Sequence, residues 1–302
     1  MDGLGDTMQR MLRPLTRFAF ALAVLAVVAP ASAQDPPADA PVVLAAGDIA
    51  NCKILVGAVA TGRLLDQSPS ATILTLGDNA YESGTASEFA ECFGPTWGRN
   101  KDRIRPVLGN HDIRTKNGGP FYEYFGERAG PKGKGYYSFE VGSWHLIAMN
   151  SAIDAGPRSK QMEWLAEDLA AHPSDCILAY WHVPLFSSGP HGPIPQMLQA
   201  WKALLSAHAD IVLNGHDHDY ERFAPQDEFG KATPNGIREF VVGTGGGGVY
   251  DFVKTSLNSE VRSNASYGVI KLTLKPGGYD WEFLPATGTF TDKGSGTCTP
   301  KP

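Results

Sequence analysis

Two histidines, His216 and His218, stand two residues apart directly after the apolar run 211–213 and a glycine. This pattern predicts a buried strand that ends in a turn from which both imidazoles project. Imidazoles at this spacing can bind a metal ion. A lone pair is common in surface turns, however, so His216 and His218 do not by themselves indicate a site.

Four other segments are built in the same way, each an apolar run that ends in a ligand-type side chain. They end in Gly47-Asp48, in Gly77-Asp78-Asn79-Ala80-Tyr81, in Gly109-Asn110-His111-Asp112 and, after the run that starts at Cys176, in His182. In open α/β sheets, functional segments converge beyond the carboxyl ends of the strands. Two aspartates, a tyrosine, an asparagine and three histidines at one such edge predict a site for two metal ions.

Single members of this set have simpler interpretations. Asp48 or Asp78 alone could cap a helix that follows its strand. Asn110 alone could be a turn residue with a left-handed backbone. Because both histidine motifs occur in the same chain, the metal site is favoured over these readings.

The elements that must position these residues alternate along the chain. Short apolar runs predict strands, and apolar residues at 3.6 spacing predict helices. The expected strands are 42–46, 71–76, 104–107, 136–141, 144–149, 176–181, 210–214, 238–243, 267–274 and 279–284, and the expected helices are 53–66, 158–171 and 195–208. The alternation in the front half predicts parallel pairing, and the strand-rich back half predicts hairpins at 136–149 and 267–284.

The chain has 302 residues and is 42% hydrophobic, enough for one large core. We expect a single α/β domain at 42–290 and an irregular tail at 291–302, which is rich in Gly, Thr and Pro. The glycine run 243–248 lacks the Lys-Ser/Thr of a phosphate loop. It is expected to pass close beneath the metal loops, where only glycine fits.

The first 33 residues have the pattern of a secretory signal peptide. Three arginines precede the apolar run 18–29, and Ala31-Ser32-Ala33 fits a cleavage site after Ala33. The apolar run falls short of the roughly 20 residues that span a bilayer, so a membrane anchor is the weaker alternative. We therefore expect a secreted or periplasmic protein, with no membrane association after cleavage and a disordered Pro-rich leader at 34–41.

The formal net charge of −6 disfavours nucleic acid and anionic membranes as partners. A small anionic substrate would need local positive charge, which bound metal ions would supply. The four cysteines include no Cys-x-x-Cys pair. In an exported protein they favour disulfides, for which the expected strand edges suggest Cys52–Cys92 and Cys176–Cys298. Free buried thiols are the alternative, and the sequence does not indicate an oligomeric state.

The five motifs, in this order, resemble the signatures of purple acid phosphatases, which are calcineurin-like metallophosphoesterases. The resemblance runs from about residue 42 to 284. It implies a mixed α/β (α+β) fold, a four-layer αββα sandwich of two mixed β-sheets flanked by helices. It also implies two adjacent metal ions that share Asp78. One ion would be bound by Asp48, Asp78, Tyr81 and His218, and the other by Asp78, Asn110, His182 and His216.

Tyr81 decides which branch of the superfamily the chain resembles. Ordinary metallophosphoesterases begin with Asp-x-His, but Ala50 stands at the place of that histidine. Tyr81, three residues after Asp78, would replace it. A phenol titrates near about 10, and a trivalent ion deprotonates it far more readily than a divalent ion. The expected pair is therefore Fe³⁺ with divalent iron, zinc or manganese.

The implied activity is hydrolysis of small phosphate monoesters by direct attack of a metal-bound hydroxide. His111, oriented by Asp112, would lie beside the attacked phosphate, and His191 would bind substrate or protonate the leaving group. His145, His172 and His208 are expected to be structural or exposed. One alternative is a phosphodiesterase or nucleotidase on the same site, with substrate size set by the loops 113–134 and 225–236. The other is a non-catalytic metal- or phosphate-binding protein.

Overall fold

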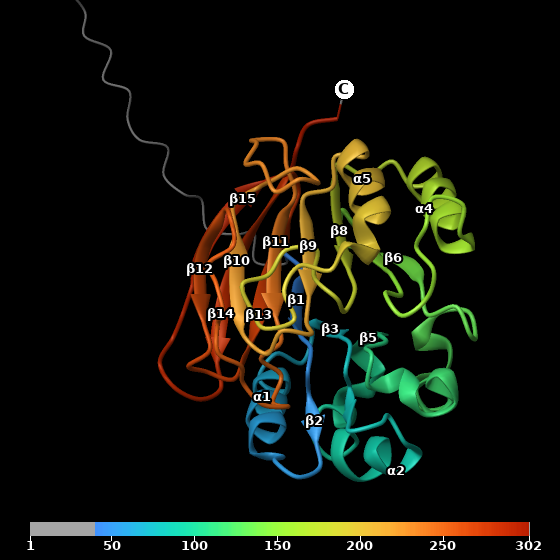
Figure 1. Ribbon diagram of the computed structural model, residues 1–302, viewed down its shortest axis with the longest axis vertical. Coiled ribbons are helices and arrows are strands. Elements are labelled where there is room, and N and C mark those ends of the chain that lie inside the picture. The colour runs from blue at the N-terminus through green and yellow to red at the C-terminus, as the bar shows by residue number, and fades with distance from the viewer. Residues whose placement is uncertain (1–39, 302) are drawn as a thin grey trace, which may run out of the picture. The chain divides into compact units, whose positions relative to one another are not determined.

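The computed structural model describes residues 40–301 (Figure 1). The predicted signal peptide and most of the predicted leader lie outside these residues. At the leader's end, the carbonyl of Pro41 accepts a hydrogen bond of 2.9 Å from the amide of Leu274. Within the described part of the chain, no helix combines the length and the apolar character needed to cross a membrane.

Two mixed sheets form the centre of the described fold. The six-stranded sheet has the order β15 (Lys293–Thr297), β14 (Gly278–Pro285), β13 (Gly268–Lys275), β1 (Val42–Ala46), β3 (Thr72–Leu76) and β5 (Ile104–Val107). The seven-stranded sheet has the order β12 (Ser259–Ser263), β10 (Tyr220–Phe223), β11 (Arg238–Val242), β9 (Ile211–Asn214), β8 (Cys176–Tyr180), β7 (Trp144–Ala148) and β6 (Tyr137–Val141). A short parallel pair joins β2 (Ala50–Asn51) to β4 (Ala80–Tyr81).

The strands that precede the predicted ligands run parallel within each sheet. In the first sheet β1, β3 and β5 run parallel, and in the second β7, β8, β9 and β11 do. These strands are buried along almost their whole length because both faces of each sheet are covered. Along β8, for example, Leu178 faces the core between the sheets, whereas Ile177 faces the core under the helices.

The longer helices lie on the outer faces of the sheets. Helix α1 (Val56–Asp66) contributes Ala58 and Leu65 to the core of the six-stranded sheet, whereas α4 (Lys160–Ala171) and α5 (Leu198–Ser206) cover the seven-stranded sheet. Shorter elements are α2 (Ala86–Glu88), a π-helical turn at Phe89–Phe93, α3 (Gly119–Phe125), and 3-10 turns at Gly98–Arg103, Asp112–Arg114, Lys116–Gly118, Gly126–Ala129 and Pro195–Met197. The expected four-layer arrangement of two mixed sheets between helices is confirmed.

Each predicted strand and helix has a counterpart, but the structure adds elements. The predicted irregular tail was wrong for residues 293–297, which form β15. Its Gly294 and Gly296 lie opposite Trp281 and Tyr279, whose rings occupy the space where a Cβ would stand. Cross-strand packing against aromatic rings therefore makes a strand from a segment whose composition predicts a loop. The segment 113–134, expected as a loop, folds into short helical turns and α3.

Both predicted disulfides are confirmed. Cys52–Cys92 and Cys176–Cys298 each have a Cα–Cα distance of 5.4 Å. The first joins the loop after β1 to the π-helical turn that follows β4. The second ties the start of β8 to the residue just after β15, so the C-terminal strand is anchored to the opposite sheet.

Candidate metal centre

The predicted ligands meet at one edge of the two sheets. Each follows the carboxyl end of a parallel strand: Asp48 after β1, Asp78 after β3, Asn110 after β5, His182 after β8, and His216 and His218 after β9. Tyr81 belongs to β4, whose pairing with β2 brings its side chain back over Asp48 and Asp78. All seven predicted ligands therefore come together.

The hydroxyl of Tyr81 and three polar atoms around it form a first cluster. This oxygen lies 2.8 Å from Oδ1 of Asp48, 3.1 Å from Oδ2 of Asp78 and 3.1 Å from Nε2 of His218. His218 Nε2 lies 3.2 Å from Oδ1 of Asp48. Ligands about 2.1 Å from an octahedral ion lie about 3 Å from one another, so this spacing fits donors around one metal ion.

A second cluster lies beside the first and uses Nε2 of His182 as its centre. This nitrogen is 3.0 Å from Oδ1 of Asn110, 3.2 Å from Nδ1 of His216 and 3.4 Å from Oδ2 of Asp78. Asp78 Oδ2 is therefore a member of both clusters. A single carboxylate oxygen between two donor sets is the geometry of a bridging ligand.

Hydrogen bonds hold the remaining polar atoms of His182, Asp48 and Asp78. Nδ1 of His182 lies 2.8 Å from the carbonyl of Leu76, so a proton on Nδ1 leaves Nε2 free to bind a cation. The second oxygen of Asp48 accepts from the amide of His216, and that of Asp78 accepts from the amide of His111, both at 2.8 Å. The donor atoms are thus fixed in orientation before any ion binds.

The electrostatics of the cluster call for positive charge. Burial alone would raise the pKa of Asp48, but His218 and His182 outweigh it and hold that pKa well below its usual range. Burial raises the pKa of Tyr81 well above 10, and both carboxylates add to the effect. Burial lowers the pKa of His182, but Asp78 and Asp48 overcome this and raise it to about 9. Buried anions of this kind require cations, which protons or metal ions can provide.

Glycine backbone lies directly under the first cluster, as predicted for the run 243–248. A Cβ at Gly243 would come within 2.9 Å of Oδ2 of Asp48, and one at Gly247 within 2.8 Å of the Tyr81 ring. Asp48, Asp78 and His216 themselves have positive φ values of 59°, 49° and 73°. Non-glycine residues adopt this conformation rarely, and such strain gathers at functional sites.

His111 lies at the rim of the centre, but the expectation that Asp112 orients it was wrong. Nδ1 of His111 lies 2.8 Å from the carbonyl of Glu82, and Nε2 lies 3.1 Å from a guanidinium nitrogen of Arg114. The buried carboxylate of Asp112 instead accepts hydrogen bonds from Asn79, Ala80 and Gly109. Asp112 thus connects the loops that carry Asp78 and Asn110. It does so because several N–H groups of these loops lie within hydrogen-bond distance of its carboxylate.

His191 also approaches the centre. Its ring centroid lies 4.3 Å from that of His216, and its Nδ1 lies 2.9 Å from Oδ1 of Asp217. The hydrogen bond with Asp217 raises the pKa of His191, against the effect of burial. Asp217 was not predicted, although its place between His216 and His218 was a signal. Tyr250, which stacks on His218 at 4.0 Å, had no such signal.

A family model for calcineurin-like phosphoesterases matches residues 22–220. The chain belongs to this family. The family match and the two donor clusters together make this a metallophosphoesterase with the dinuclear metal site typical of the family. The metallophosphoesterase is distantly related to purple acid phosphatases, as the resemblance in its sequence implied.

Purple acid phosphatase 15 of Arabidopsis thaliana is 29% identical over 220 residues, which cover 61% of this chain and 41% of that protein. Tartrate-resistant acid phosphatase type 5 of Rattus norvegicus is 36% identical over 78 residues, 26% of this chain and 23% of that protein. This phosphoesterase therefore spans less than half the length of these curated relatives. The structure of purple acid phosphatase PPD1 from yellow lupin has the same fold, with a TM-score of 0.74, 19% identity, and coverage of 84% of this chain and 53% of that one.

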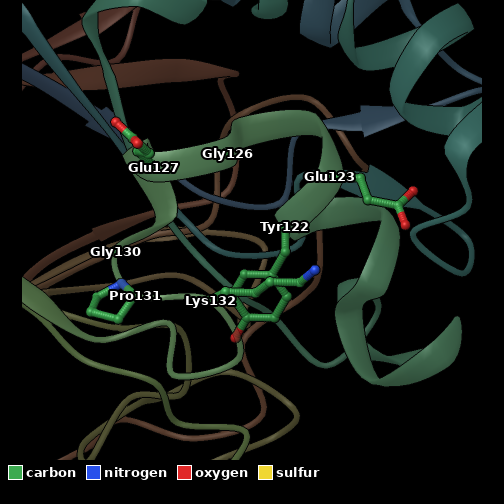
Figure 2. A pocket seen from close by; sticks show the side chains of 7 residues that line it. All are labelled: Tyr122, Glu123, Gly126, Glu127, Gly130, Pro131 and Lys132. Carbon is green, nitrogen blue, oxygen red and sulfur yellow. The ribbon is translucent and has the colours of Figure 1, made fainter.

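Of two surface hollows, one contacts the metal centre and the other does not. A hollow of about 310 Å³ touches both Asn110 and His216, and its walls include Ile113, Val183 and Gln196. A larger pocket of about 550 Å³ is formed by α3 and the turn after it (Figure 2). Its lining residues are Tyr122, Glu123, Gly126, Glu127, Gly130, Pro131 and Lys132, none of which is a predicted site residue. The smaller hollow is therefore the candidate substrate pocket.

Proposed function

We propose that this metallophosphoesterase is an exported hydrolase of small phosphate monoesters that acts by direct attack of water on phosphorus. The observation that carries the proposal is the membership of Asp78 Oδ2 in both donor clusters, 3.1 Å from the Tyr81 hydroxyl and 3.4 Å from His182 Nε2. Two ions that share this oxygen would hold a phosphoryl group between them.

The donor sets fit two ions of different charge. One ion would be held by Asp48, Asp78, Tyr81 and His218, and the other by Asp78, Asn110, His182 and His216. When bound, the ions would polarise the phosphoryl oxygens and lower the pKa of the attacking water. Because Tyr81 resists ionisation beside two carboxylates, its phenolate favours a trivalent ion. The proposed pair is Fe³⁺ with divalent iron, zinc or manganese.

The charge of the centre supports a monoester as substrate. Two carboxylates and one phenolate against a trivalent and a divalent ion leave a net charge of about +2, which matches a monoester dianion. The adjoining hollow of about 310 Å³ has the size for a small ester. A diester carries one negative charge and complements the centre less well.

The histidines at the rim would act on the substrate rather than on the ions. Nδ1 of His111 lies beside the Glu82 carbonyl, and Nε2 lies beside the guanidinium of Arg114. A phosphoryl oxygen would replace this contact with Arg114 and accept a hydrogen bond from Nε2 of His111, and Arg114 would supply adjacent positive charge. His191 is held at Nδ1 by Asp217, so its other nitrogen is available to protonate the leaving alkoxide.

Two observations support export. The two disulfides suit an oxidising compartment, and the predicted signal peptide at 1–33 would direct the chain there. In that case the catalytic domain would begin at about residue 42, and the C-terminal segment would belong to it through Cys298.

The test compares turnover of a chromogenic phosphomonoester with that of its diester analogue, together with metal content. We expect monoester preference in the wild-type protein and loss of both metals and activity in Asp78→Ala. Asp292→Ala is the matched control, since it removes another largely buried aspartate, one that pairs with Arg222 instead.

Each other outcome identifies a different function. Diester preference with the same dependence on Asp78 would replace the monoesterase by a phosphodiesterase. No turnover of either ester, across metals and pH values, would leave a binding protein. An Asp78→Ala variant that stays active and loaded with metal would refute the site itself.

A further inference from the structure

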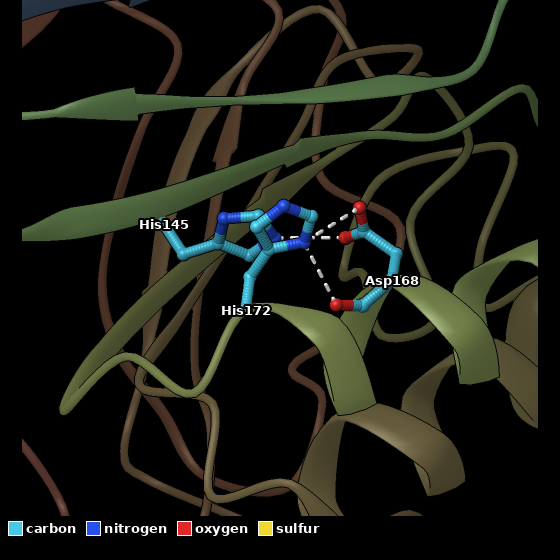
Figure 3. A group of neighbouring side chains, drawn as sticks. All are labelled: His145, Asp168 and His172. Carbon is cyan, nitrogen blue, oxygen red and sulfur yellow. Dashed lines mark hydrogen bonds and ion pairs between the residues drawn. The ribbon is translucent and has the colours of Figure 1, made fainter.

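A second group of side chains of the types that bind metal ions consists of His145, Asp168 and His172 (Figure 3). His145, Asp168 and His172 each offer one ligand atom, and these three atoms all lie within 4.8 Å of one another. Nε2 of His145 is 2.7 Å from Oδ2 of Asp168, and Nδ1 of His172 is 3.3 Å from Oδ1 of Asp168. Nδ1 of His172 also lies 3.0 Å from the backbone carbonyl of Asp168, so the three ligand atoms gather around this residue.

This group belongs to the opposite end of the seven-stranded sheet from the catalytic loops. His145 lies near the start of β7 and in register with Ile177 of β8, whereas His182 follows the end of β8. Five residues of extended chain, roughly 16 Å, separate Ile177 from His182. The two sites are thus distinct.

Backbone structure fixes the spacing of the three side chains. Asp168 and His172 are four residues apart at the end of α4, and the amide of His172 donates to the carbonyl of Asp168 at 3.0 Å. The rings of His145 and His172 stack at 4.9 Å with an angle of 14° between their planes. Both rings turn a nitrogen toward Asp168, which lies to one side of the stacked pair (Figure 3).

The surroundings are those that orient metal ligands. Oε1 of Glu140 lies 2.6 Å from Nδ1 of His145, which places a carboxylate behind the imidazole. The hydroxyl of Ser138 donates to Oδ1 of Asp168 at 2.5 Å. Carboxylates that accept from the far nitrogen of a ligating histidine fix the ring and make it a better donor.

Charge and access also suit a cation. The side chains of His145 and Asp168 are 1% and 4% exposed, whereas that of His172 is 49% exposed. A surface hollow of about 340 Å³ leads to His172, and its walls include Glu140 and Asp175 but no lysine or arginine. A dication can therefore enter from this side, and water can complete its coordination.

We propose that His145, Asp168 and His172 form a third, mononuclear binding site for Zn²⁺ or a similar divalent transition metal. Two imidazoles and one carboxylate are the donors that such ions prefer, and three protein ligands leave one position for water. In the metal-free protein a proton lies between His145 Nε2 and Asp168. The ion takes its place, so one proton leaves from this nitrogen on binding.

The experiment is equilibrium dialysis of the full protein against Zn²⁺, followed by metal analysis. His172→Ala removes the most exposed ligand and is the variant least disruptive to folding. We expect it to hold one equivalent of Zn²⁺ fewer than the wild type, whatever the dinuclear centre retains. The control is His208→Asn, which removes a histidine elsewhere and keeps a residue that tolerates the φ of 58° at this position. It should match the wild type.

A second variant tests the same site without removing a ligand. Glu140→Gln changes only a half-exposed carboxylate behind His145, so we expect weaker binding at this site by roughly 10-fold or more. If His172→Ala and the wild type hold the same amount of Zn²⁺ at every concentration, the group is an ion-pair network and the proposal is wrong. Equal affinity in Glu140→Gln and the wild type would overturn the role of Glu140.

Discussion

The Cys52–Cys92 disulfide connects the two loops that carry most of the first donor cluster. Cys52 follows Asp48 by four residues, and Cys92 lies in the buried turn after Tyr81. Cys176–Cys298, in contrast, lies at the other end of β8 from the catalytic loops. Both bonds are cross-links of the same type, but only Cys52–Cys92 lies close to the metal centre.

The stability that is lost when each disulfide is removed depends on the length of the chain segment that the bond closes into a loop. Cys52–Cys92 spans 40 residues and Cys176–Cys298 spans 122. The loss of chain entropy in the unfolded state gives about 4 kcal/mol for the shorter loop and about 5 kcal/mol for the longer one. Since domains are stable by about 5–15 kcal/mol, both losses are large fractions of the total.

The perturbation is replacement of each pair by alanine. Alanine is preferred to serine because Cys92 and Cys176 are buried and a hydroxyl there would lack a partner. We expect the Cys176→Ala/Cys298→Ala variant to lose more stability, by about 1 kcal/mol. We expect the Cys52→Ala/Cys92→Ala variant to lose more metal and more turnover, because its loop positions Asp48 and Tyr81.

Urea unfolding of the metal-free proteins measures the first expectation. The dependence of the unfolding free energy on urea concentration should become steeper in both variants, because the unfolded chain expands when a cross-link is removed. The quantity to compare is therefore the unfolding free energy extrapolated to water, and not the midpoint. Metal analysis and phosphomonoester turnover measure the second. Greater metal loss in the Cys176→Ala/Cys298→Ala variant would refute the link between the shorter loop and the centre. Losses below about 1 kcal/mol in both would refute the entropic estimate.

Three further predictions concern single residues. Tyr81→Phe removes the phenolate, so the centre should retain divalent zinc in preference to Fe³⁺, measured by competitive loading; unchanged iron preference would contradict the role of Tyr81. His191→Asn should slow hydrolysis of alkyl phosphates by roughly 10²–10⁴-fold but that of nitrophenyl phosphate much less, because only a poor leaving group needs a proton; an equal slowing would exclude general acid catalysis. Burial and nearby Glu221 raise the pKa of Glu239 well above 4.5. The stability that this group contributes is therefore full below about pH 4.5 and falls as the pH rises toward the folded-state pKa, by at most about 1.4 kcal/mol per pH unit. We measure the unfolding free energy of Glu239→Gln and the wild type by urea unfolding at pH 5 and pH 8. The difference in favour of the variant should be larger at pH 8, and an equal difference at both pH values would contradict the raised pKa.

Much of the fold was predictable because the central strands bury both faces. The run 42–46 is apolar throughout, and the structure has a strand with these bounds. β10 was missed because its Glu221 and Arg222 break the apolar pattern. Glu221 is nevertheless fully buried, since Ser188 donates to it through both its amide and its hydroxyl. A long-range contact of this kind leaves no periodic signal in the sequence.

The sequence by itself determined the types and order of the candidate metal ligands. Each of these residues stands at or near the end of an apolar strand, and the strands of an α/β sheet must bring such ends together. The identity of Tyr81 and the lack of a histidine at Ala50 also indicated the branch of the family. The first conclusion needs only local pattern and the geometry of parallel strands, whereas the second rests on the resemblance to purple acid phosphatases.

The tertiary structure alone decided which atoms touch. It placed the Glu82 carbonyl behind His111, assigned Asp112 to the backbone of neighbouring loops, and paired His191 with Asp217. It also brought His145 from a strand to Asp168 on a helix, 23 residues further along the chain. Such contacts depend on sheet register, on loop paths and on which buried donors lack a closer acceptor, and these are properties of the packed chain.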